Sequence, residues 1–415
     1  MKYNLAFNTK TMSVDIADRN LQEVIHAKHV EVPFYGKDEI VRAINNPIGT
    51  KKLRDIVFPN EKIVIITSDI TRPMPSNLVL PLILDELALA RVDRNNISIV
   101  FALGIHRKHT IEEMKSLVGD EIYQNFKCID SDVNDCVNLG YTKNKTPIDI
   151  FRIVAEANRR ICLGNIEYHY FAGYSGGAKA IMPGVSTKAA IQINHKQMIE
   201  EKAHAGNLVT NPVRIDIEEA INYIPIDFIL NVVLNEDKEV IKAVAGHYIK
   251  AHRAGCMFLD QLYKVKIDSK ADIVIASAGG FPKDINLYQA QKTIDNAKHA
   301  VKAGGIIILV ASCKEGYGEP TFEDWMIKST KPSELIDRIK KEFILGGHKA
   351  AAIASVLAHN KVFLVSELDD TVVRDMFFEP YHNLQEAYDA ALNIMGNQAK
   401  TIIIPHGGSV LPYHQ

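Results

Sequence analysis

The chain has 415 residues, of which 47% are hydrophobic and 24% charged, and its formal net charge is −2. These values are typical of a globular protein of two or three domains, and the absence of a basic run argues against a nucleic-acid partner. No apolar stretch approaches the roughly 20 residues that a transmembrane helix needs, and the start of the chain has no signal-peptide pattern. The five cysteines have no C-x-x-C spacing. We therefore expect a cytoplasmic protein with no membrane partner and no sulfur-rich metal site of its own.

The first part of the chain alternates apolar, β-branched runs with amphipathic segments, a pattern that predicts an α/β fold. Thr110 and Glu113 have the spacing of a capping box at the start of a helix. The expected strands are, in chain order, 2–8, 13–16, 62–67, 97–102, 128–131, 148–154, 161–164 and 226–234. The expected helices are 36–45, one that starts at Thr110, and 76–91, 187–203 and 214–221.

A long amphipathic segment over residues 249–265 is interpreted as a connector between domains. Beyond it, a strand, a helix and a return strand predict a βαβ unit, which is almost always right-handed and part of a parallel sheet. The expected elements are strands 272–277, 306–311, 362–366 and 402–404 and helices 287–303, 332–343 and 350–359.

The sequence thus predicts two Rossmann-like α/β domains with mostly parallel sheets and an active-site cleft between them. The predicted N-terminal domain, which binds the cofactor, covers residues 1–264 and is joined by the segment 405–415. The predicted C-terminal domain covers residues 265–404 and closes the cleft.

Polar side chains follow the carboxyl ends of several expected strands. Asp69 and Arg72 follow the strand 62–67, His106 follows 97–102, and His169 follows 161–164. Ligands of open parallel sheets bind outside these strand ends. We therefore expect these side chains and Lys179 near one cleft. Three residues of the second domain are expected to reach into it: Tyr288, Gln289 and Lys292.

Two histidines on opposite sides of a substrate could invert a stereocentre, because either ring can take a proton while the other returns one. His106 and His169 are the candidates, and the alternative for each is a loop histidine that binds a backbone group. Arg72 would bind a carboxylate with two hydrogen bonds, or instead form an ion pair with Asp69. Lys292 would add a point charge.

The segment from Glu167 to Val185 has three closely spaced glycines, Gly173, Gly176 and Gly177, followed by Lys179. Such a turn can present amide N–H groups to an anion, and Lys179 would lie at its edge. The alternative is a tight turn with a solvated lysine. Metalloprotease, P-loop and G-x-G-x-x-G motifs are absent from the sequence.

Five sequence stretches together resemble the nickel-pincer lactate racemase family. They are SDITRP, ALGIHRKHT, EYHYFAGYSGGAKAIMPGVS, INHKQM and GGFPKDINLYQAQK, and the resemblance extends from about Val57 to the C-terminus. The family's cofactor is a nickel pincer nucleotide, in which nickel is bound to a thio-derivatised pyridinium mononucleotide. The cofactor supplies the sulfur ligands, so few cysteines are required.

The resemblance assigns roles to individual residues. It implies a covalent thioamide link to Lys179 and a nickel ligand at His195, which the sequence alone would describe as a helix histidine. It implies acid–base roles for His106 and His169, and substrate-binding roles for Arg72 and for the second-domain residues named above. It places the cofactor near the Asp69 turn and the glycine turn, in which the contacting residues are Ser175, Gly176 and Gly177.

The implied activity is racemisation or epimerisation of a 2-hydroxy acid at C2, by hydride transfer to the cofactor through a 2-keto acid. The implied partners are the small-molecule substrate and the proteins that make and insert the cofactor. Within the family, a sugar-acid epimerase is the alternative to a lactate racemase, and substrate choice would depend on Tyr288 and the turn 346–349. A nicotinamide-dependent 2-hydroxy acid dehydrogenase and a non-catalytic sensor are the rival functions.

Overall fold

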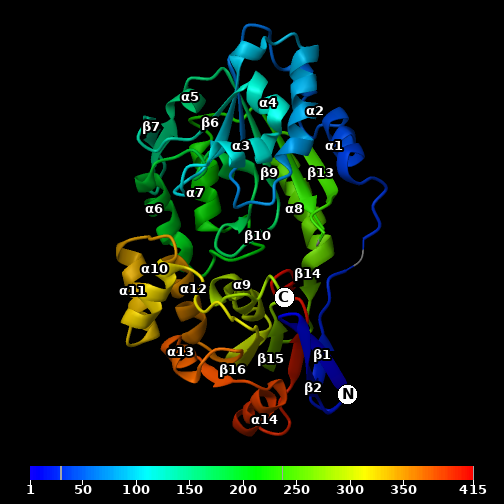
Figure 1. The fold of residues 1–415 in the computed structure, drawn as a ribbon, viewed down its shortest axis with the longest axis vertical. Coiled ribbons are helices and arrows are strands. Elements are labelled where there is room, and N and C mark those ends of the chain that lie inside the picture. The colour runs from blue at the N-terminus through cyan, green and yellow to red at the C-terminus, as the bar shows by residue number, and fades with distance from the viewer. Residues whose placement is uncertain (29, 236, 415) are drawn as a thin grey trace. The chain divides into compact units, whose positions relative to one another are not determined.

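The computed structural model describes residues 1–28, 30–235 and 237–414. The chain divides into two compact units, one formed by residues 30–260 and the other by residues 1–29 together with 261–415. Each unit is built on a six-stranded sheet (Figure 1). In the described residues, no helix has the length and apolar character needed to cross a membrane.

The sheet of the 30–260 unit is parallel except at one edge. Its strand order is β13-β12-β9-β4-β5-β6, and only the β12–β13 pair is antiparallel. The strands are β4 (Ile63–Ser68), β5 (Ile97–Ala102), β6 (Lys127–Asp130), β9 (Arg159–Asn165), β12 (Phe228–Leu234) and β13 (Val240–Gly246). Because β9, β4, β5 and β6 are consecutive neighbours, their carboxyl ends lie along one edge of the sheet.

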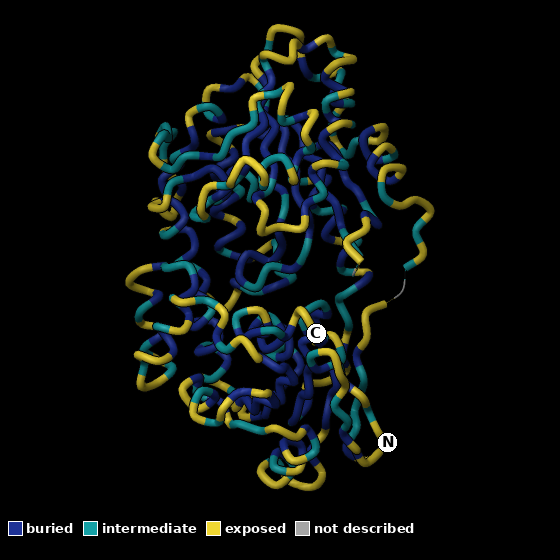
Figure 2. Tube along the Cα trace, viewed as in Figure 1, coloured by how far each residue is buried: buried dark blue, intermediate teal, exposed yellow. Residues whose placement is uncertain are grey.

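One face of this sheet packs on α1 (Gly36–Asn45) and α2 (Ser76–Leu89), which share a buried core with alternate strand residues such as Ile65 and Ile99. Figure 2 shows the strands of the unit as mostly buried. The other α-helices are α3 (Ile111–Val118), α4 (Asp120–Asn125), α5 (Arg152–Ala155), α6 (Lys188–Lys196), α7 (Pro212–Ala220) and α8 (Lys250–Tyr263), which ends past the unit boundary. Antiparallel pairs are formed by β7 (Cys136–Tyr141) with β8 (Pro147–Phe151) and by β10 (Tyr168–His169) with β11 (Gly173–Tyr174).

The second unit has an all-parallel sheet of order β18-β17-β16-β15-β19-β3. Its strands are β3 (Leu21–Val24), β15 (Ala271–Ser277), β16 (Val301–Val310), β17 (Lys361–Val365), β18 (Glu379–Tyr381) and β19 (Thr401–Ile404). A hairpin of β1 (Lys2–Phe7) and β2 (Lys10–Asp15) packs on one face together with α14 (Leu384–Met395). The other helices are α9 (Leu287–Ala297), α10 (Pro320–Lys328), α11 (Pro332–Lys341), α12 (Gly347–Leu357) and α13 (Asp370–Asp375).

Strand pairing assigns both chain ends to this second unit. β3 pairs with β19, and β20 (Leu411–Tyr413) pairs with β14 (Lys264–Lys266). The sequence-based boundaries instead grouped residues 1–29 and 405–415 with the N-terminal domain. Pairing between segments so far apart in the chain leaves no local sequence signal.

The predicted α/β class with mostly parallel sheets is confirmed, but several element boundaries differ. The helix expected over 187–203 ends at Lys196 and continues only as a 3-10 turn, Gln197–Ile199. The helix expected over 287–303 ends at Ala297, and Gly304 and Gly305, which we expected to terminate it, lie inside β16. The strand expected over 148–154 ends at Phe151, where α5 follows. The elements that the sequence analysis missed include β3, β7, β13, α4, α10, α13 and α14.

Candidate active site

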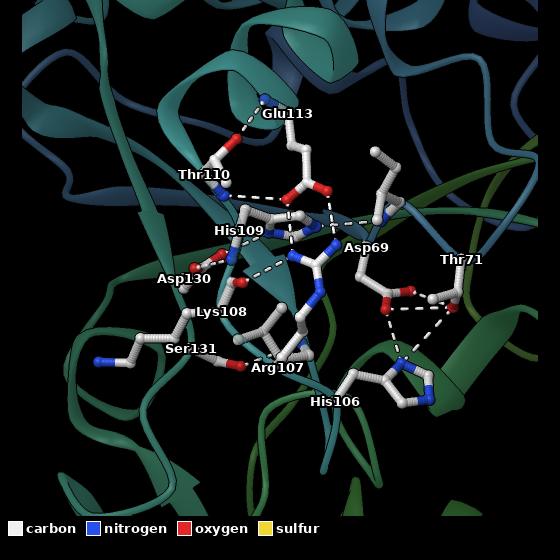
Figure 3. A network of polar contacts seen from close by, with 12 residues as sticks. Asp69, Thr71, His106, Arg107, Lys108, His109, Thr110, Glu113, Asp130 and Ser131 are labelled. Carbon is white, nitrogen blue, oxygen red and sulfur yellow. Dashed lines mark hydrogen bonds and ion pairs between the residues drawn. The ribbon is translucent and has the colours of Figure 1, made fainter. Parts of the chain in front are cut away.

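Asp69 and His106 form a hydrogen-bonded pair at the ends of the adjacent strands β4 and β5 (Figure 3). Nδ1 of His106 lies 2.6 Å from Oδ2 of Asp69, and the Thr71 hydroxyl donates to both carboxylate oxygens at 2.9 and 3.1 Å. Burial raises the pKa of Asp69, but its hydrogen bonds to His106 and Thr71 and the charge of Arg72 outweigh burial and lower it overall. A carboxylate can only accept, so the proton of a neutral His106 ring is on Nδ1, and Nε2 carries the lone pair.

Arg72 connects this loop electrostatically to the segment that follows β9. Its Nη1 lies 3.9 Å from Oε1 of Glu167, so its ion-pair partner is Glu167 rather than Asp69. The positive charge of Arg72 also contributes to lowering the pKa values of His169 and Lys179. The predicted proximity of Asp69, Arg72, His169 and Lys179 therefore agrees with the structure.

His169, Lys179 and His195 surround one aromatic ring, that of Phe171. The ring centroid of Phe171 lies 4.5 Å from that of His169 and 4.8 Å from that of His195, and the amine of Lys179 is 6.0 Å from it. Phe171 is buried, with 3% exposure. The sequence analysis missed it, because an apolar residue in an apolar stretch is indistinguishable from ordinary core.

Burial favours the neutral forms of the Lys179 amine and the His169 ring. Desolvation is the largest cause at each, and it lowers their pKa values well below the ordinary range. The neighbouring guanidinium groups of Arg72 and Arg214 act in the same direction on both pKa values. Lys179 is only partly exposed, so the alternative of a solvated lysine does not describe it. A neutral amine is the nucleophilic form of lysine.

The resting tautomer of His169 differs from that of His106. Nδ1 of His169 accepts the backbone N–H of Ala172 at 3.3 Å, so its proton is on Nε2. This contact agrees with the alternative interpretation of His169, which is a loop histidine that binds a backbone group. His106 does not fit that alternative, because its partner is the Asp69 carboxylate.

A chain of buried hydrogen bonds orients the ring of His195. Nδ1 of His195 lies 2.8 Å from Oδ1 of Asn194, whose side-chain amide donates to Oδ2 of Asp216 at 2.7 Å. Two threonine hydroxyls, those of Thr142 and Thr146, donate to Asp216 as well. Because Nδ1 is engaged with Asn194, a metal bound to this ring has to bind through Nε2. Among the described residues, no group of three or more His, Cys, Asp or Glu side chains could hold a metal ion.

The glycine turn packs against protein rather than presenting a full set of N–H donors. The N–H of Gly177 donates to Oδ1 of Asn231 at 2.8 Å, and that of Ser175 donates to the carbonyl of Glu167 at 2.9 Å. The Ser175 hydroxyl also forms hydrogen bonds within the chain. Two N–H groups of the predicted anion cradle are thus bound within the chain, and the assignment of Ser175, Gly176 and Gly177 to cofactor binding stays a prediction.

Close packing explains why glycines are needed in this turn. Gly176 and Gly177 have φ values of +74° and +60°, and a Cβ at Gly177 would lie 2.9 Å from Cγ of His252. The fully buried Arg214 donates to the carbonyl groups of Ala172, Tyr174 and Gly176, and Nε2 of His252 donates to that of Ser175. These two side chains, which the sequence analysis missed, fix the turn that precedes Lys179.

Tyr288, Gln289 and Lys292 belong to the second unit, on the first two turns of α9. Gln289 is exposed, and the amine of Lys349 lies 3.9 Å from the ring centroid of Tyr288. This contact joins Tyr288 to residues 346–349, which we expected to form a turn that influences substrate choice and which instead begin α12. The assignment of these three residues to substrate binding stays a prediction.

Two imidazoles, a guanidinium and a lysine amine follow the carboxyl ends of parallel strands in this unit, and the comparisons identify the class of the protein as an isomerase of the racemase type. Residues 7–206 match the family model described as the lactate racemase N-terminal domain, and residues 266–411 match that of the lactate racemase C-terminal domain. The chain belongs to the lactate racemase family.

Two relatives named lactate racemase match nearly the whole chain. The one from Thermoanaerobacterium thermosaccharolyticum is 35% identical over 98% of both chains, and the one from Lactiplantibacillus plantarum is 34% identical over 98% of this chain and 99% of its own. A solved structure of the T. thermosaccharolyticum lactate racemase apoprotein has a TM-score of 0.90 and 34% identity, covering 99% of this chain and all of that one. A Thermotoga maritima protein shares the fold, with a TM-score of 0.64 and 19% identity, over 91% of this chain and 98% of its own.

Proposed function

We propose that the protein racemises a 2-hydroxy acid at C2 with a nickel pincer nucleotide as cofactor, and that lactate is the first substrate to test. The observation that carries this proposal is the neutral amine of Lys179, grouped with His169 and His195 around Phe171. The names of the two relatives support lactate as the substrate.

The donors in this group fit the proposed cofactor. An amine must be neutral to form an amide-type bond, and the pKa of Lys179 is lowered accordingly. Imidazole is a suitable nickel ligand. Because Nδ1 of His195 is in contact with Asn194, a metal would bind this ring through Nε2. Lys179 would therefore hold the cofactor covalently and His195 would bind its nickel. When bound, the cofactor supplies the acceptor and donor for the hydrogen at C2.

The side chains of the protein bind the substrate and move its hydroxyl proton. Arg72, partly exposed and paired with Glu167 only at 3.9 Å, has donors for the substrate carboxylate. Nε2 of His106 accepts the hydroxyl proton, and Asp69 stabilises the charge that forms on the ring, as an aspartate does for a general-base histidine. His169 is the second proton-transfer group, for the opposite enantiomer; to accept a proton at Nδ1, its ring has to give up the N–H of Ala172.

The test uses protein co-expressed with the enzymes that make the cofactor. Intact-mass measurement should show an adduct that is absent from the Lys179→Ala variant. The loaded wild type should convert either pure enantiomer of lactate into the racemate, and His106→Ala and His169→Ala should each lose this activity. Oxidation of the acid with loosely bound NAD would favour a dehydrogenase, and binding without conversion of any 2-hydroxy acid tested would favour a sensor.

A further inference from the structure

A second imidazole–carboxylate pair, His109 and Asp130, lies beside Asp69 and His106 (Figure 3). Nδ1 of His109 lies 2.6 Å from Oδ1 of Asp130, and the other carboxylate oxygen accepts the backbone N–H of His109 at 2.8 Å. The two side chains are 1% and 6% exposed. Asp130 is the last residue of β6, the strand next to β5, so this pair lies at the same sheet edge as the proposed catalytic residues.

The other nitrogen of the His109 ring reaches the loop that follows β4. Nε2 of His109 accepts the backbone N–H of Ile70 at 3.1 Å. An accepting nitrogen carries no hydrogen, so the proton of the ring is on Nδ1 and is donated to Asp130. The ring also packs edge-on against Phe101, with centroids 5.2 Å apart. Asp130 and Phe101 thus fix the tautomer and the orientation in which His109 can hold Ile70.

Ile70 is the residue between Asp69, which orients His106, and the Thr71–Arg72 turn. The N–H of Arg72 closes this turn by donating to the carbonyl of Asp69 at 3.1 Å. Ile70 itself is 41% exposed, so its side chain gives the loop little packing. The hydrogen bond to His109 therefore restrains the loop from its backbone.

We infer that His109 is a positioning residue for racemisation: through the N–H of Ile70 it holds the loop that carries Asp69 and Arg72. This inference rests on the proposed function. It gives a role to a histidine that the sequence analysis left without one, and it makes Asp130 the residue that fixes the His109 tautomer. The loop connects the two imidazole–carboxylate pairs: His109 restrains the backbone of the loop, and Asp69 in the loop orients His106.

Two conservative variants separate the two contacts of the His109 ring. His109→Asn places an amide near the former Nδ1, so it can bond Asp130 but leaves the N–H of Ile70 without its acceptor. His109→Gln places an amide oxygen near the former Nε2, so it can accept from Ile70 but loses Asp130. Each variant gives up one of two side-chain hydrogen bonds, so the two are matched in kind. His382→Asn is the control, because His382 is 60% exposed and belongs to the second unit.

The first readout is hydrogen exchange of the Ile70 amide in the cofactor-free protein, followed by ¹⁵N TROSY NMR. We expect His109→Asn to lose protection at Ile70, and His109→Gln and His382→Asn to keep it. The second readout is kcat and KM of the nickel-loaded enzyme. We expect His109→Asn to lower kcat by about 10²-fold, as misplacement of catalytic groups does, and to raise KM through Arg72. His109→Gln should stay within about 10-fold of wild type.

A purely structural role would give a different pattern. Activity would then follow thermal stability in both variants, whether or not the Ile70 acceptor is kept, and that result would overturn the inference. Unchanged exchange at Ile70 in His109→Asn would overturn it as well. If the loaded wild type racemises nothing, the proposed function fails, and the positioning role of His109 in racemisation fails with it. The exchange pattern still decides whether His109 holds the loop.

Discussion

Replacing Lys179 with methionine is expected to stabilise the 30–260 unit at neutral pH while abolishing the proposed cofactor attachment. Desolvation, Arg72 and Arg214 lower the pKa of the amine, and Glu167 opposes them only in part. The folded chain therefore holds a neutral amine at a pH where the unfolded chain holds a protonated one, because an unfolded lysine has a pKa of about 10.4. Methionine has a similar length and no proton to release.

The expected magnitude follows from proton linkage. Between the lowered folded pKa and about pH 10.4, the unfolded state binds one more proton than the folded state, so wild-type stability rises by up to about 1.4 kcal/mol per pH unit. The methionine variant lacks this contribution to the slope. Its stability advantage over wild type is therefore largest at and below the folded pKa, and it shrinks as the pH approaches about 10.4.

The assay is urea unfolding of the cofactor-free proteins at pH 7, 8 and 9, followed by circular dichroism. Trp325, the single tryptophan, lies in the second unit, so its fluorescence follows that unit separately. Lys188→Met is the matched control, because Lys188 is exposed in the first turn of α6, and its slope should equal that of wild type. A Lys179→Met variant that is less stable than wild type, with a parallel pH dependence, would refute the neutral-amine argument.

Three further changes have defined outcomes. Asp69→Asn should lower kcat/KM by about 10²–10⁴-fold, because the His106 ring loses the group that orients it. The factor should be the same from either enantiomer, because mirror-image acids have equal free energy in water, and unequal factors would contradict racemisation. Arg72→Met should raise KM for a 2-hydroxy acid by about 10–100-fold, the loss of a charged hydrogen bond, and an unchanged KM would exclude carboxylate binding there. Gly177→Ala should cost about 1–3 kcal/mol of stability in thermal unfolding, because φ is +60° and the new Cβ would meet His252; unchanged stability would show that the turn can rearrange.

The grouping of Asp69, Arg72, His106 and His169 was predictable because it depends on local patterns. Each residue follows an apolar run that is clearly a strand, and parallel neighbours bring their carboxyl ends to one edge. The structure has β9, β4 and β5 side by side, as this reasoning requires. The capping box of Thr110 and Glu113, another local pattern, is confirmed.

The partners of these residues were not predictable, because each pairing joins distant parts of the chain. Asp130 meets His109 across 21 residues, and Asp216 meets Asn194 across 22. Spacing of that size has no period that a sequence pattern could reveal. The glycine turn shows the same limit. Its special backbone was foreseen, but the side chain that packs on Gly177 is His252, 75 residues further along the chain.

The electrostatics of the site explain how substrate binding would activate its base. Desolvation and the charges of Arg72 and Arg214 lower the pKa of His169 well below its ordinary range. A carboxylate bound at Arg72 would offset that positive charge and raise the pKa of His169 towards neutrality, where general acid–base catalysis is most efficient. The arginine proposed to hold the substrate therefore also couples its arrival to the strength of the base. Glu167 lies 3.9 Å from Arg72, and a bound substrate would compete with it for the same guanidinium.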